Sequence, residues 1–301
     1  MTKKLHKMYP FNNPNRRLLG FILVVHVVLI ALNALWMSPT LDEPAHVVAG
    51  ISHLRMGDFS LYRVNPPLVR AVASVPVLLA GYEMDFPKVL NDQFSRNEFR
   101  LGEEFVSQNG RRVLWLITLG RWACIPFSLL GAITCYLWGR DLYGRSSGLF
   151  ACSLWCFSPM VLGHAALLTP DAPAAALGML ACYTFWLWLK QPNWQRTITT
   201  GIILGLAELS KTTLILFYPL WPVLWLIYRW NERKTMTLRR WQNEGIMLAS
   251  RMLIGLYVIN VGYLGTGSFV PLKEFEFRSE MLGAVGDQSN SGNRFKEYLA
   301  E

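Results

Sequence analysis

Charged side chains are scarce in this sequence. They make up 16% of its 301 residues, whereas soluble domains average roughly 25%. Hydrophobic residues account for 52% and are concentrated in runs near the roughly 20 residues that a helix needs to cross a bilayer. The composition therefore excludes an ordinary soluble domain. It predicts an all-α fold, a polytopic bundle of transmembrane helices.

The short motifs of common soluble enzymes are also absent from the sequence. There is no P-loop, no HExxH zinc motif and no dinucleotide-binding fingerprint. The five cysteines lie in or beside apolar runs, and we read them as small packing residues and not as disulfides. Cys152 and Cys156 lie four residues apart, but a metal site needs further ligands. The basic residues form no single face, so the net charge of +9 does not predict nucleic-acid binding.

The positions of the basic residues orient the predicted spans. The stretches 1–17, 139–147, 190–197 and 229–245 together carry fourteen Lys and Arg against three Asp and Glu. Because positive charge collects on the cytoplasmic side, we expect a multi-pass protein of the plasma (inner) membrane with a cytoplasmic N-terminus. Seven spans are predicted, at about Leu18–Met37, Val113–Trp138, Leu149–Leu162, Pro173–Leu189, Ile198–Leu209, Thr212–Tyr228 and Ile246–Leu264.

The first span leads into a long outer loop, residues 38–111. Early in it Asp42 and Glu43 precede a proline, which suits the first turn of a helix. We expect a short helix with Glu43 as its cap and its end at Gly57. The positive end of the helix dipole favours ionised carboxylates at this position.

The rest of the outer loop is expected to contain further short elements. His46 and His53 lie seven residues apart and share a helix face. Asn65-Pro66-Pro67-Leu68 predicts an extended turn. The apolar run Val69–Ala80 is too short to cross the membrane and contains a proline, so we expect a helix that lies at the interface or dips into the membrane. We interpret Tyr82–Arg111 as an ordered polar loop.

Several polar residues lie in or next to the later spans. Asp171 precedes a span, where a carboxylate could bind a ligand or could simply cap the helix. Lys211 could pair with a phosphate or could mark the membrane boundary. Arg121 lies within a span and must be paired or line a cavity, and Glu208 is a candidate partner. His26, in the first span, is more simply explained by hydrogen bonds between helices.

Taken in order, these motifs resemble the membrane glycosyltransferases of the GT-C fold. The similar families are the protein mannosyltransferases and the lipid A aminoarabinose transferase. Their first outer loop carries an acidic pair and then an X-Pro-Pro-Leu turn, and later motifs supply an arginine, an acid before a span and a lysine. The matching positions are Asp42-Glu43, Asn65-Pro66-Pro67-Leu68, Arg121, Thr169-Pro170-Asp171 and Gly205-Leu-Ala-Glu-Leu-Ser-Lys211.

The resemblance implies transfer of a sugar from a polyprenyl-phosphate carrier to an acceptor at the outer face. Asp42 would be the catalytic base, and Glu43 would orient it or bind the acceptor. Arg121 and Lys211 would bind the lipid phosphate. Further substrate contacts would come from His46, Asn65 and Asp171. The acceptor would be a protein, a lipid or a glycan, with membrane lipid around the bundle. No cofactor is required, although Asp171 with another acid or His46 could hold a divalent metal.

Two departures from these families affect the interpretation. Asn65 stands where many relatives have His or Lys. The transferase-like domain, residues 18–264, is followed by a polar outer tail, 265–301, where relatives usually have further spans and often a soluble domain. A truncated or inactive transferase is therefore one alternative. The other is a polytopic transporter or lipid flippase, which would need polar residues at mid-membrane and broken helices.

Overall fold

The computed structural model describes residues 14–86, 96–271 and 274, and every regular element in these ranges is a helix. The chain divides into two units after Tyr263, and residues 264–269 of the second unit form turns. Most of the predicted tails, 1–17 and 265–301, lies outside the described residues. The α-helices, all in the first unit, are α1 (Pro14–Trp36), α2 (Asp42–Met56), α3 (Leu68–Ala80), α4 (Asn97–Asn109), α5 (Arg112–Tyr143), α6 (Arg145–Phe157), α7 (Pro159–Ala165), α8 (Asp171–Lys190), α9 (Trp194–Glu208), α10 (Phe217–Arg229) and α11 (Leu238–Gly262).

Four helices, α1, α5, α8 and α11, are long and apolar enough to cross a membrane, and α6 with α7 makes a fifth if this pair, bent by 57°, is one span. The prediction of a helical membrane bundle is thereby confirmed, but seven spans are not. The predicted fifth and sixth spans correspond to α9 with 15 residues and α10 with 13. At about 1.5 Å per residue, both are shorter than the roughly 30 Å hydrocarbon core.

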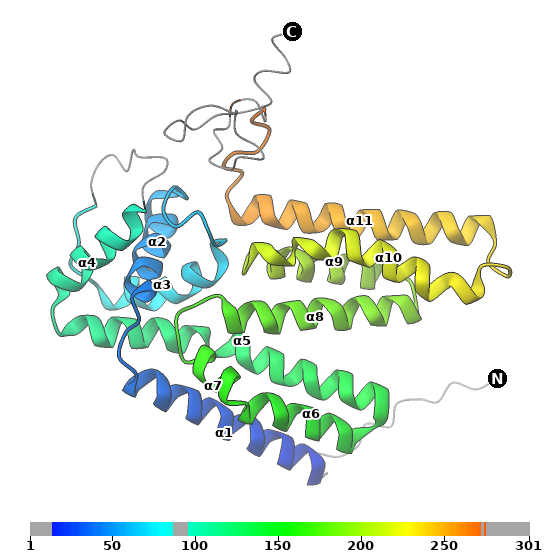
Figure 1. The fold of residues 1–301 in the computed structure, drawn as a ribbon, viewed down its shortest axis with the longest axis horizontal. Coiled ribbons are helices and arrows are strands. Elements are labelled where there is room, and N and C mark those ends of the chain that lie inside the picture. Colours follow the sequence, from blue (N-terminus) through cyan, green and yellow to red (C-terminus); the bar gives the residue numbers. More distant parts are fainter. Residues whose placement is uncertain (1–13, 87–95, 272–273, 275–301) are drawn as a thin grey trace, which may run out of the picture. The chain divides into compact units, whose positions relative to one another are not determined.

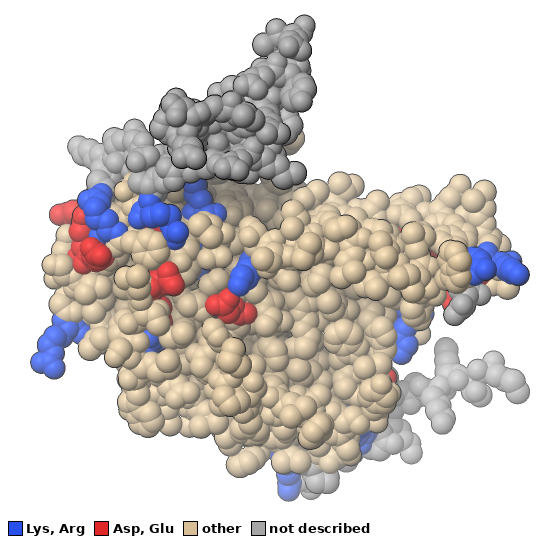
Figure 2. Space-filling view, in the orientation of Figure 1, with Lys and Arg blue, Asp and Glu red and all other residues tan. Residues whose placement is uncertain are grey.

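The helices from α8 onward alternate in direction, so the bundle has two distinct ends (Figure 1). At one end the Nζ of Lys211 contacts the Oδ1 of Asp171 at 2.7 Å. At the other, the Nη2 of Arg229 donates to the carbonyl of Leu189 at 2.7 Å. We call these the Asp171 end and the Arg229 end. In Figure 2 charged side chains gather near both ends, and the helical surface between them is largely uncharged.

Close packing of small residues joins α9 to α11 within this bundle. A Cβ added at Gly201 would lie 2.8 Å from the carbonyl oxygen of Arg251, and one at Gly205 would lie 2.5 Å from the Cβ of Val258. Neither position has room for a larger residue. A spacing of four on one helix therefore provides a flat contact face for the neighbouring helix.

Helices α2, α3 and α4 form a small group at the Asp171 end (Figure 1), which we call the outer unit. Helix α2 ends at Gly57, whose φ of 63° lies in the left-handed region, as the sequence predicts. The expected polar loop over Tyr82–Arg111 is wrong in part, because α4 forms within it and buries Leu101 and Phe105. Their spacing of four residues places both on the face that packs against α2. Residues 87–95 of that loop lie outside the described residues.

Hydrogen bonds also join the spans within the bundle. The Nδ1 of His26, on α1, lies 2.8 Å from the carbonyl of Cys156, and its Nε2 lies 2.9 Å from the Oγ of Ser128. The prediction that this buried histidine links helices is confirmed. Such contacts stabilise a membrane bundle because they satisfy polar groups that cannot reach water.

Candidate active site

A deeply buried ion pair at the Asp171 end joins Glu43 to Arg121. The Nε and Nη2 of Arg121 donate to the two carboxylate oxygens, each at 2.6 Å, in a two-pronged ion pair. The side chains are 0% and 1% exposed. Glu43 comes from the first turn of α2 and Arg121 from the first third of α5, so the pair fixes the outer unit to the bundle.

Backbone groups complete the coordination of this pair. The Nη1 of Arg121 donates to the carbonyls of Ala34 and Met37, and its Nη2 also donates to that of Ser38. All five guanidinium N–H groups therefore have acceptors. Glu43 in turn accepts from three further donors, the backbone N–H groups of Thr40 and Leu168 and the hydroxyl of Thr40.

This arrangement corrects two sequence-based expectations. Arg121 is paired with Glu43 and not with Glu208. Glu43 is not the cap of α2: it lies inside the first turn, and Leu41 occupies the cap position without a side-chain hydrogen bond. Neither member of the pair keeps an unused group for a substrate in this structure. Both side chains are buried and fully hydrogen-bonded, and they hold the start of α2 against α5.

Asp42, the neighbour of Glu43, has a different environment. Its side chain is exposed to solvent. Its Oδ1 accepts a hydrogen bond from the phenol of Tyr62 at 3.2 Å. Adjacent residues on a helix point about 100° apart, which is why one acid faces the bundle and the other faces outward.

Tyr62 is the site residue that the sequence did not reveal. Its ring stacks on His46, with centroids 4.1 Å apart, and the guanidinium of Arg70 lies 4.8 Å from the ring centroid. Its φ of 56° is unusual for a residue with a side chain. The only sequence signal is an aromatic residue three positions before the Asn65 turn, and aromatic residues are common in loops near membranes.

Burial sets the protonation states around Tyr62. It raises the pKa of Tyr62 to about 12, and the charge of Asp42 adds to this shift, so the phenol keeps its proton and remains a donor. Burial lowers the pKa of His46 to about 3; the Arg70 charge reinforces this change and the Asp171 charge opposes it. Burial likewise lowers the pKa of His53 to about 4. Both histidines are neutral at physiological pH.

These two histidines predict acid sensitivity of the folded protein. In the unfolded chain a histidine titrates near 6.5. As pH falls from about 6.5 toward about 4, the unfolded state gains protons that the folded state excludes. Each histidine therefore lowers the free energy of unfolding by up to about 1.4 kcal/mol per pH unit. In detergent, the temperature midpoint of unfolding should fall as the pH drops below ~6.5. It should fall less steeply with pH in His53→Gln. His164→Gln serves as the control, and a flat midpoint in the parent protein would contradict the prediction.

A second cluster of polar side chains at this end is centred on Asp171. Besides the contact with Lys211, its Oδ2 lies 3.8 Å from the Nδ1 of His164. All three side chains are between one third and one half exposed. Lys211, which the sequence assigned to a phosphate or to the membrane boundary, is thus held by an acid and remains accessible. Within the described residues, no three His, Cys, Asp or Glu side chains are grouped to hold a metal ion.

The Asn65–Leu68 turn connects the outer unit to the cluster around Asp171. The carbonyl of Asn65 accepts from the buried Arg70, which also donates to the carbonyl of Tyr62 at 2.8 Å. The N–H of Leu68 donates to the carbonyl of Leu209 at 3.1 Å, two residues before Lys211. Asn65 itself is half-buried. All seven site residues predicted from the sequence lie at the Asp171 end, namely Asp42, Glu43, His46, Asn65, Arg121, Asp171 and Lys211.

Part of the chain is similar to a family of known proteins. Residues 116–263 match the family model described as dolichyl-phosphate-mannose-protein mannosyltransferase. The match runs from α5 to the end of α11 and includes Arg121, Asp171 and Lys211. It confirms the resemblance to GT-C membrane glycosyltransferases. No curated protein and no solved structure matches the chain.

Proposed function

We propose that this chain, whose residues 116–263 match the dolichyl-phosphate-mannose-protein mannosyltransferase family, is a membrane glycosyltransferase with a polyprenyl-phosphate-linked sugar as donor. The acceptor hydroxyl belongs to a protein, a lipid or a glycan. Transfer takes place on the outer face of the membrane, at the Asp171 end. The charge distribution supports this orientation, since the basic connections lie at the Arg229 end.

One observation carries the proposal: of the two adjacent acids, only Asp42 is available to a substrate. Glu43 is saturated by Arg121 and backbone donors, whereas Asp42 is exposed and hydrogen-bonded to Tyr62. A general base must reach the proton that it removes. We therefore assign the base to Asp42, and we assign to Glu43 and Arg121 the positioning of the helix that carries it.

The proposed reaction is a displacement at the anomeric carbon of the sugar. The acceptor oxygen forms a bond to this carbon, and its proton passes to the carboxylate of Asp42. The bond from the same carbon to the phosphate oxygen breaks, and the electron pair leaves with the polyprenyl phosphate. Inversion follows if the base and the phosphate lie on opposite faces of the sugar, as in inverting glycoside chemistry.

Lys211 supplies the positive charge that the leaving phosphate requires. An ammonium group has three N–H donors, and one of those of Lys211 contacts Asp171. The others are free to bind phosphate oxygens, since the side chain is 35% exposed. Asp171 and His164 position the lysine. His46, neutral and stacked on Tyr62, fixes the phenol that hydrogen-bonds to the base. Asn65 is proposed to contact the substrate from the turn beside Lys211.

A surface groove at the start of α2, lined by the residue before Asp42, provides room for an acceptor. Its volume is about 260 Å³, and it lies between the start of α2 and α4. Leu41, the residue before Asp42, and Pro44 form one wall, and Phe99 and Val106 belong to the other. The lining is mainly apolar, which suits a hydrophobic portion of an acceptor next to the reacting hydroxyl.

Replacing Lys211 tests the donor class. Purified protein in detergent micelles would receive radiolabelled polyprenyl-phosphate mannose and a mixture of acceptors. Hydrogen bonds to charged groups contribute about 1.5–3 kcal/mol, so Lys211→Met should lower kcat/KM for the donor by roughly 10- to 100-fold.

Lys190→Met is the matched control, because this lysine lies at the other end of α8. It should leave transfer unchanged. Equal rates in Lys211→Met and the parent protein would remove Lys211 from the site. Transfer only from a water-soluble nucleotide sugar would overturn the proposed donor class.

A further inference from the structure

A second cavity lies at the Arg229 end, on the opposite side of the membrane from the candidate active site. Its volume is about 330 Å³. Helix α8 separates the two regions: it begins at Asp171 and has 20 residues, a length of about 30 Å. The lining residues come from the first turns of α11 and the residues around it, namely Pro192, Thr237, Arg239, Arg240, Asn243, Glu244 and Met247.

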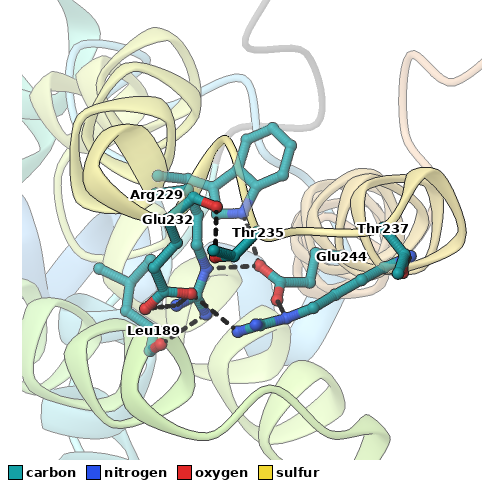
Figure 3. A network of polar contacts seen from close by, with 8 residues as sticks. Leu189, Arg229, Glu232, Thr235, Thr237 and Glu244 are labelled. Atoms are coloured by element: carbon teal, nitrogen blue, oxygen red, sulfur yellow. Dashed lines mark hydrogen bonds and ion pairs between the residues drawn. The ribbon is translucent and has the colours of Figure 1, made fainter.

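A polar network next to this cavity neutralises the acids (Figure 3). The Oε2 of Glu244 accepts from the Nε of Arg229 at 2.8 Å, and both side chains are buried. The Nε of Arg240 contacts the other oxygen of Glu244 at 3.1 Å, and its Nη2 contacts Glu232 at 3.1 Å. Because each carboxylate already has a cation, neither repels an approaching anion strongly.

Arg239 remains as a cation without a protein partner in this network. Its side chain is exposed, lines the cavity and makes no hydrogen bond or ion pair with any described residue. Together with Arg229 and Arg240 it gives three guanidinium groups against the two carboxylates of Glu232 and Glu244, a local charge of +1. The cavity is therefore electropositive.

The start of α11 adds backbone donors to this positive charge. The Oγ1 of Thr237, at the N-cap, accepts from the N–H of Arg240 at 3.3 Å. The earlier N–H groups, those of Leu238 and Arg239, have no acceptor within the helix. A helix N-terminus and a free guanidinium at one cavity form a suitable environment for an anionic phosphate.

Exposed apolar side chains at the same end of the bundle indicate that the anion belongs to a lipid. Trp194, Trp230, Leu238 and Ile246 are all exposed near this end. Tryptophan at this level is typical of the boundary between headgroups and acyl chains. Basic pockets at the ends of transmembrane helices on the cytoplasmic side bind acidic lipid headgroups. A soluble phosphate would not need these exposed apolar side chains.

We propose that the cavity lined by Arg239, Arg240 and Asn243 binds the phosphate headgroup of an anionic phospholipid in the leaflet opposite the active site. Arg239 contacts the phosphate directly. Arg240 is shared between the headgroup and the Glu232–Glu244 network. The acyl chains lie along the exposed apolar surface of α11. This site is independent of the proposed transfer reaction and fixes the Arg229 end at the membrane surface.

The test compares lipids retained by the purified protein in its native form. Protein in nanodiscs of phosphatidylcholine with a fixed fraction of phosphatidylglycerol is released and examined by native mass spectrometry. The parent protein should retain phosphatidylglycerol preferentially. One basic residue near an anionic surface changes lipid binding by about fivefold, so Arg239→Gln should reduce that preference by about this factor.

Lys234→Gln is the matched control, since it removes the same charge from an exposed residue that does not line the cavity. It should retain the parent preference. Equal losses in the two variants would show a diffuse charge effect and overturn the proposed site. Displacement of the bound lipid by millimolar inorganic phosphate alone would show that the cavity recognises free anions, and would overturn the assignment to a lipid.

Discussion

Arg121→Met is expected to reduce the free energy of unfolding by about 3–5 kcal/mol, the range for removing one partner of a buried ion pair. The substitution leaves the carboxylate of Glu43 buried with hydrogen bonds but no cation. It also leaves the carbonyls of Ala34, Met37 and Ser38 without their donor. These groups join α1, α2 and α5, so the outer unit should be the first part of the variant to separate from the bundle on unfolding.

Denaturant titration in detergent micelles measures this effect. Arg111→Met is the matched control, because this arginine is exposed at the start of α5; its effect should stay within about 0.5 kcal/mol. The double variant Glu43→Leu/Arg121→Met should be more stable than the sum of the single losses predicts, by about 1–3 kcal/mol. An Arg121→Met protein with parent stability would show that the arginine is not a structural residue.

Asp42→Asn is expected to lower the rate of sugar transfer by about 10²- to 10⁴-fold, the usual contribution of a general base. The amide keeps the shape of the side chain and can still accept the hydrogen bond from Tyr62, but it cannot take the proton of the acceptor. Because Asp42 is exposed and in no ion pair with a described residue, its replacement should leave stability nearly unchanged.

Glu83→Gln provides the control for Asp42→Asn, since Glu83 is another exposed acid of the outer unit. Its transfer rate should equal that of the parent protein. The comparison is made at saturating donor, so that a change in rate reflects the chemical step and not donor binding. A loss of only a few-fold in Asp42→Asn would assign the base to another residue.

The sequence could predict which residues meet at the Asp171 end, but not how they pair. The apolar runs and the basic connections place Asp42, Asp171 and Lys211 at the same face, and this grouping depends only on helix length and direction. The division between Asp42 and Glu43 depends on which side of α2 packs against α5. That choice is fixed by Arg121, 78 residues later in the chain, which local patterns cannot reveal.

Tyr62 and the number of spans show two other limits of the sequence. Tyr62 lies in a turn with a left-handed φ and no periodicity, so its contact with His46 follows only from the folded turn. The predicted fifth and sixth spans rested on apolar runs, and basic stretches were used only to orient them. In the structure, α9 ends at Glu208 and a short 3₁₀ helix (Thr212–Leu216) precedes α10. Both helices are therefore shorter than the roughly 20 residues that a span needs.

The transfer rate and the unfolding midpoint of Asp42→Asn, determined on one preparation, most directly test the division of roles between the adjacent acids. We expect transfer to fall by at least about 100-fold, while the midpoint stays at the parent value and Glu43→Gln lowers it. Transfer at the parent rate in Asp42→Asn would contradict this division of roles and would exclude Asp42 as the base.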